Sequence, residues 1–175
     1  MFRYQANKIL LVLVIFFLTG CTIKITNNKF GLILQDYGYV FAEDERGDYY
    51  SLVTELEDRI TENIIYVKSN SIQQIMTKEA NGFKRTEIAS YNYNNDTMVI
   101  LVEETELGSG NTVTVTKRYS FKDNKISTEE TGFEVKEWTD EKFIEFSVKV
   151  KQHIINNLKI MNLTFEDLTK LKPMT

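Results

Sequence analysis

The chain has 175 residues, a formal net charge of −4 and a composition that is 42% hydrophobic and 12% aromatic, which indicates a folded domain rather than a disordered chain. An acidic balance repels nucleic-acid phosphates, and no basic stripe offsets it, so we expect no nucleic-acid binding. One cysteine and one histidine are too few for an intrachain disulfide or for a typical zinc or copper site.

The N-terminal segment has the layout of an export signal. Arg3 and Lys8 form a positive start without acidic residues, and the apolar run 9–18 is too short for a permanent transmembrane helix. The run ends in Leu18-Thr19-Gly20-Cys21, which resembles the lipobox of bacterial lipoproteins. In that family the cysteine thiol receives diacylglycerol, and the signal is cleaved just before the cysteine. The resemblance covers residues 1–21 and implies that Cys21 is a lipid anchor.

The lipid anchor implies a location in the cell envelope. Two acyl chains hold a protein stably on a membrane, and diacylglycerol supplies both. Thr22 is not the aspartate that retains lipoproteins at the inner membrane of two-membrane cells. We therefore expect attachment to the outer membrane, or to the outside of the plasma membrane in a one-membrane cell. The chain divides into a signal peptide at 1–20, a short tether or first strand at 21–28, and a single domain at 29–175.

The first part of the domain mixes strand and helix patterns. Residues 23–25 and 30–41 predict one or two strands, and the acidic segment 43–48 predicts a turn. Apolar residues at helical spacing predict a helix over 49–63, with Asp48 as its N-cap.

A second pair of short elements follows. Residues 63–69 predict a short strand. Ser71 and Gln74 have the spacing of a capping box, and the apolar residues of 72–80 form a helical stripe, so a short helix is predicted to end at Asn81-Gly82.

From residue 83 the pattern changes to period two, which predicts a sheet. Strands are predicted at 83–93, 97–104, 112–121 and 125–138, with polar or glycine-rich turns between them. Strand 97–104 is apolar on both faces, as expected for a central strand. These four strands form an antiparallel meander.

A long C-terminal helix is predicted to cover this sheet. Thr139 or Asp140 caps it, and its apolar stripe comprises Phe143, Phe146, Val150, Ile154, Leu158 and Met161. A short terminal helix is predicted to start at Thr164 and to stop before Pro173. The expected fold class is α+β, with an antiparallel meander of about four to six strands packed against helices.

The residue types that most often act in catalysis form no catalytic pattern in this sequence. His153 lies at the edge of the helical stripe without an oriented partner for acid–base work. The acidic pairs Glu103-Glu104 and Glu129-Glu130 lie on strands, where neighbouring side chains point to opposite faces, and the spacing of a calcium-binding loop is absent. We therefore expect no enzymatic activity, no metal site and no cofactor.

Four tyrosines around the acidic turn are candidate binding residues: Tyr37, Tyr39, Tyr49 and Tyr50. Core packing accounts for most tyrosines in a folded chain. Tyrosines beside a polar loop are also typical of recognition surfaces.

The leading hypothesis is a non-catalytic envelope lipoprotein, anchored through diacylglycerol on Cys21, that binds an envelope protein or another envelope component. One alternative is a carrier whose sheet and covering helix enclose a lipid or another apolar ligand. A second alternative is an immunity or exclusion lipoprotein against a toxin, since an acidic surface suits a basic toxin.

Cys21→Ala tests the anchor. The wild-type protein is expected to partition into detergent, to incorporate labelled fatty acid and to lose residues 1–20. The variant is expected to lose all three properties, because the modified cysteine is what the signal peptidase of this family requires. Recovery of unlipidated wild-type protein with a different N-terminus would contradict the lipoprotein hypothesis.

Overall fold

The structure is a computed structural model that describes residues 28–56, 58–131 and 138–172. Cys21, the predicted signal peptide and the strand predicted at 23–25 lie outside the described residues. Within these ranges, no helix is long and apolar enough to cross a membrane.

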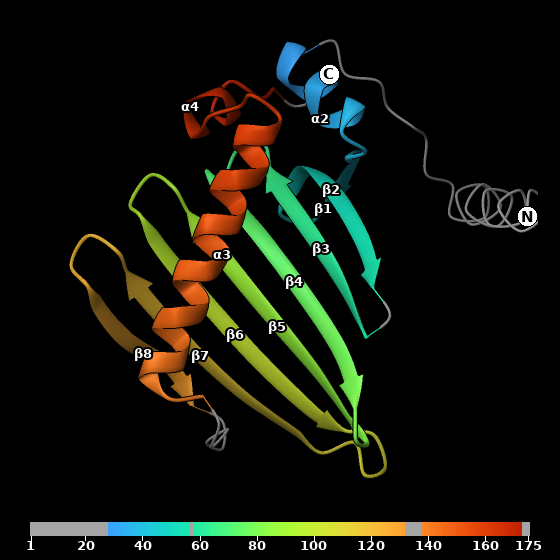
Figure 1. Cartoon of the computed structure of the whole chain (residues 1–175), viewed down its shortest axis with the longest axis vertical. Helices are drawn as coiled ribbons and strands as arrows, with labels where there is room; N and C mark the ends of the chain where they lie inside the picture. The colour runs from blue at the N-terminus through green and yellow to red at the C-terminus, as the bar shows by residue number, and fades with distance from the viewer. Residues whose placement is uncertain (1–27, 57, 132–137, 173–175) are drawn as a thin grey trace, which may run out of the picture.

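The described chain forms one antiparallel sheet of eight strands in sequence order, with helices against one of its faces (Figure 1). The strands are β1 Val40–Asp44, β2 Gly47–Leu56, β3 Arg59–Tyr66, β4 Ser71–Ala80, β5 Phe83–Asn92, β6 Thr97–Glu106, β7 Thr112–Ser120 and β8 Lys125–Thr131. The helices are α2 Lys29–Asp36, α3 Asp140–Ile160 and α4 Phe165–Leu168. The antiparallel meander and the long C-terminal helix are confirmed, but the sheet has more strands than the four to six predicted.

Helix α3 runs diagonally across the sheet and packs on β5, β6 and β7 (Figure 1). The Thr139 side chain accepts a hydrogen bond from the Lys142 amide, and acidic residues occupy the first turn, so the helix begins where the sequence predicted. The apolar stripe is buried against side chains that the strand register places on one face of the sheet. These sheet residues are Ala89, Tyr91, Met98, Ile100, Val102 and Val115.

One detail of the predicted stripe differs. Phe146 is only partly buried, and its ring packs edge-on against Trp138 at 5.4 Å. Ser147 lies fully buried instead, and its hydroxyl donates to the Phe143 carbonyl oxygen at 2.7 Å. The small serine lets the helix approach the sheet closely, while its hydroxyl is satisfied within the helix.

The strand prediction for residues 30–41 is wrong over its first part, which forms α2. The Asn28 side chain accepts a hydrogen bond from the Phe30 amide at 2.9 Å and caps the helix, and Gly38 (φ 88°) reverses the chain after it. The segment Lys29–Asp36 places Gly31 and Leu34 inward, so its apolar run is one face of a helix.

The helix predicted over 49–63 is also wrong, because this segment forms β2 and most of β3. Tyr50 and Leu52 join the core on the α3 side, whereas Val53 points to the other face and is 54% exposed. The helical spacing of apolar residues therefore did not correspond to one buried face.

The short helix predicted over 72–80 is β4. Ile72 and Met76 are four residues apart, a spacing that places side chains on one face in a helix and in a strand alike. The Asn81-Gly82 pair distinguishes the strand from the helix. Both residues have positive φ, 53° and 81°, and form the two-residue turn of the β4–β5 hairpin rather than a helix end.

Phe143→Ala tests the packing of α3. The side chain is almost fully buried between the helix and the sheet, so its removal is expected to lower the free energy of unfolding by about 3–5 kcal/mol. Val148 is about half exposed on the same helix, so Val148→Ala is the control and is expected to change stability by less than ~0.5 kcal/mol. Equal effects in urea unfolding would contradict this placement of the helix.

Glu87 makes the stability of the protein depend on pH. It lies on the α3 side of β5 between Met76 and Val102 of the neighbouring strands. Burial raises the pKa of Glu87 above its usual 4.5, and nearby Arg85 only partly offsets this. The folded protein therefore binds this proton more tightly than the unfolded chain, and ionisation of Glu87 opposes folding as pH rises through the raised pKa. Glu87→Gln is expected to match the wild-type melting temperature below pH 4.5, to exceed it increasingly as pH rises to the raised pKa, and to keep a constant advantage above it. A melting-temperature difference that does not change with pH would contradict the burial of this carboxyl.

Candidate functional site

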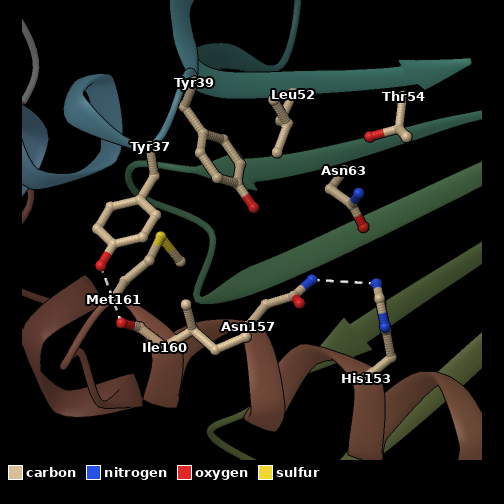
Figure 2. Close-up of a pocket in the computed structure, with 9 residues that line it drawn as sticks. All are labelled: Tyr37, Tyr39, Leu52, Thr54, Asn63, His153, Asn157, Ile160 and Met161. Carbon is tan, nitrogen blue, oxygen red and sulfur yellow. Dashed lines mark hydrogen bonds between the residues drawn. The ribbon is translucent and has the colours of Figure 1, made fainter.

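A pocket of about 210 Å³ opens where the C-terminal half of α3 faces β2 and β3, beside the end of α2 (Figure 2). We call it the Tyr39 pocket. Its lining consists of Tyr37, Tyr39, Leu52, Thr54, Asn63, His153, Asn157, Ile160 and Met161.

The chain reversal after α2 positions both tyrosines. Tyr37 is the C-cap residue of α2, and the Tyr39 amide donates to the Leu34 carbonyl oxygen at 3.0 Å. Gly38 between them adopts a positive φ, which a residue with a side chain would occupy only with strain. As a result Tyr39 turns inward with its ring buried and its hydroxyl in the pocket (Figure 2).

Tyr37 and Ile160 form the rim of the pocket. The Tyr37 hydroxyl donates to the Ile160 carbonyl oxygen at 3.0 Å, which fixes the tyrosine ring against the end of α3 (Figure 2). Both side chains remain accessible, Tyr37 at 47% and Ile160 at 64% exposure. The rim therefore presents an oriented aromatic ring and an aliphatic side chain to the solvent.

Amide groups supply the polar part of the wall. Asn63 Oδ1 accepts a hydrogen bond at 2.9 Å from Nε2 of Gln74, its paired residue on β4, which fixes the Asn63 amide. Asn157 Nδ2 lies 3.0 Å from His153 Nε2, one turn earlier on α3 (Figure 2). Burial raises the pKa of Tyr39, so its hydroxyl keeps its proton at neutral pH and remains a donor.

The chemistry of the pocket is that of uncharged recognition. Its nine lining residues include no Asp, Glu, Lys or Arg, so apart from His153 it offers no counter-charge to an ionised ligand group. Within this lining the hydrogen-bonding partner of His153 is an amide, that of Asn157, rather than a carboxylate. Elsewhere in the described chain, no cluster of three or more His, Cys, Asp or Glu side chains is placed to hold a metal ion.

The four candidate tyrosines separate in the structure. Tyr37 and Tyr39 meet at the pocket, but Tyr50 is fully buried in the core, where its ring packs edge-on against Phe41 at 5.2 Å. Tyr49 points to the opposite face of the sheet and lies 5.7 Å from the Tyr66 ring. Tyr49 and Tyr50 therefore do not line the pocket.

The remaining lining residues were not identified as binding residues from the sequence. Asn63 lies in the segment predicted as a helix, and Asn157 lies beside the helical stripe, so neither stands out by its spacing. They meet only because α3 returns over the sheet after eight strands.

Comparison of the chain with protein families, with curated proteins and with solved structures finds no match.

Proposed function

We propose that the protein is a non-catalytic, lipid-anchored lipoprotein of the bacterial cell envelope that binds another envelope protein. In this proposal the partner inserts one side chain into the Tyr39 pocket. The size and the lining of the pocket support the insertion of one partner side chain.

The size of the pocket favours a single inserted group. Sites that enclose whole small molecules usually measure about 300–1,000 Å³, whereas an apolar cavity of about 150 Å³ is enough for one benzene ring. At about 210 Å³, the Tyr39 pocket matches one aromatic or branched side chain. Such pockets accept the buried anchor residues that contribute most of the affinity in protein interfaces.

The lining favours an uncharged, partly polar anchor. Leu52, Met161 and the tyrosine rings provide apolar contact, and the amides of Asn63 and Asn157 offer hydrogen bonds. Tyrosine is enriched at protein interfaces because it combines a large apolar surface with a polar group. A tyrosine or a neutral amide side chain of the partner fits this combination.

The filled core supports protein binding over the lipid-carrier alternative. In a carrier, the space between the covering helix and the sheet would hold the ligand. Here Phe143, Val150 and Ile154 of α3 occupy that space and are almost fully buried against the sheet. Between α3 and β5–β7, protein side chains take the place of a ligand.

Site-specific photocrosslinking in cells tests the proposal. A photoreactive residue at Thr54, which lines the pocket, is expected to capture a protein partner (Figure 2). The matched control is the same residue at Val53, which is exposed on the opposite face of the same strand and is expected to capture none. Asn157→Trp, which fills the pocket, is expected to abolish capture at Thr54.

Two outcomes would contradict the proposed binding site: equal capture at Thr54 and Val53, or capture at Thr54 that persists in a folded Asn157→Trp protein. Thermal unfolding of each variant shows whether the fold is retained.

A further inference from the structure

We infer that the end of the molecule formed by α2 and the C-terminal end of α3 rests on the surface of the bilayer that holds the anchor. The partner is the lipid interface itself, and the surface consists of Leu32, Tyr37 and Ile160 together with Lys29 and Lys159 of the same two segments. This inference rests on the proposed lipid anchor at Cys21.

Three large apolar side chains are exposed at this end. Leu32 on α2 is 43% exposed, and Tyr37 and Ile160 form the exposed rim described above. They come from segments far apart in the sequence that Figure 1 shows at the same end of the sheet. The hydrogen bond from Tyr37 to the Ile160 carbonyl oxygen holds the two segments together.

The distance to the anchor places this end next to the membrane. Asn28 begins the described domain, and its Nδ2 donates to the Lys170 carbonyl oxygen at 2.9 Å, so the chain enters beside α4. The residues between Cys21 and Asn28 span at most ~25 Å even when fully extended. A ten-residue strand is itself ~33 Å long. The opposite end of the sheet, at the β6–β7 turn, lies about one strand length farther from Asn28 than this end does.

The charge at this end of the molecule favours contact with anionic lipid head groups more than the charge of the whole chain does. Lys29 begins α2, Lys159 lies in the last turn of α3, and Lys172 lies near the chain entry, all exposed. Lys170 forms ion pairs with both Glu166 and Asp167, and Asp36 is exposed at the end of α2. The four lysines at this end exceed the three acidic residues by one, whereas the whole chain has a net charge of −4. Lysines near a membrane attract anionic lipids, and tyrosine rings favour the interfacial region.

The arrangement also places the Tyr39 pocket beside the bilayer. Tyr37 and Ile160 belong both to the pocket rim and to the proposed contact surface. A partner that enters the pocket therefore approaches close to the membrane surface.

Quenching of tryptophan fluorescence by brominated lipids tests the contact. Full-length lipidated protein is reconstituted into vesicles of brominated phosphatidylcholine and phosphatidylglycerol, in a Trp138→Phe background that removes the only natural tryptophan. Single tryptophans are introduced by Ile160→Trp and, on a separate element, by Leu32→Trp. The matched control is Val148→Trp, an exposed position on α3 that lies ~18 Å along the helix from Ile160.

The Ile160→Trp and Leu32→Trp proteins are expected to lose about half or more of their emission, because groups that rest on a bilayer enter its interfacial zone to a depth of ~5–10 Å. The Val148→Trp protein is expected to keep nearly all of its emission. Vesicle-bound protein with equal, weak quenching at all three positions would overturn the bilayer contact while leaving the anchor intact. Protein that does not float with the vesicles would overturn the anchor, and the contact with it.

Discussion

The burial of α3 against one face of the sheet is the interaction on which the rest of the structure depends. An eight-stranded meander with one uncovered apolar face would not be stable in water, and the helix removes the central strands of that face from solvent. Two ion pairs join α3 to the sheet, one in its first turn and one near its middle. Lys117 of β7 pairs with Asp140 in the first turn of α3, and Lys151 of α3 pairs with Asp96 in the β5–β6 turn.

The Lys151 contact combines electrostatics with aromatic packing. Its ammonium group lies 4.1 Å from the centroid of the Phe121 ring, and the Tyr91 hydroxyl donates to the same Asp96 carboxylate at 2.7 Å. Burial alone would raise the pKa of Asp96, but the hydrogen bonds from Lys151 and Tyr91 lower it below its usual value. The helix is thereby held in one direction across the sheet, which brings Asn157 and Ile160 to the edge where Tyr37 and Tyr39 lie.

The Tyr39 pocket is a consequence of this geometry. A straight helix that crosses a twisted sheet diagonally covers the central strands and leaves a gap over one edge. Over β2 and β3 the gap is partly closed by the reversal at Gly38, which turns Tyr39 inward and leaves Tyr37 at the rim. The same reversal brings α2, and with it the start of the domain, to the end of α3. The proposed binding pocket and the proposed membrane contact therefore share one part of the molecule.

The sequence by itself determined the elements whose local signals agree with one another. The strands from Phe83 onward alternate clearly and are separated by Asn, Asp or Gly turns, and α3 has a cap, acidic residues in its first turn and a long apolar stripe. Between Lys29 and Ala80 the predicted strands overlap only the start of β1 and the end of β3, and the tertiary structure decided the rest. A spacing of four residues suits a strand as well as a helix, and the hydrogen-bonded neighbours that select the strand are supplied by the sheet. The Tyr39 pocket was undetermined for the same reason, because Tyr39, Asn63 and Asn157 become neighbours only when α3 packs over the finished sheet.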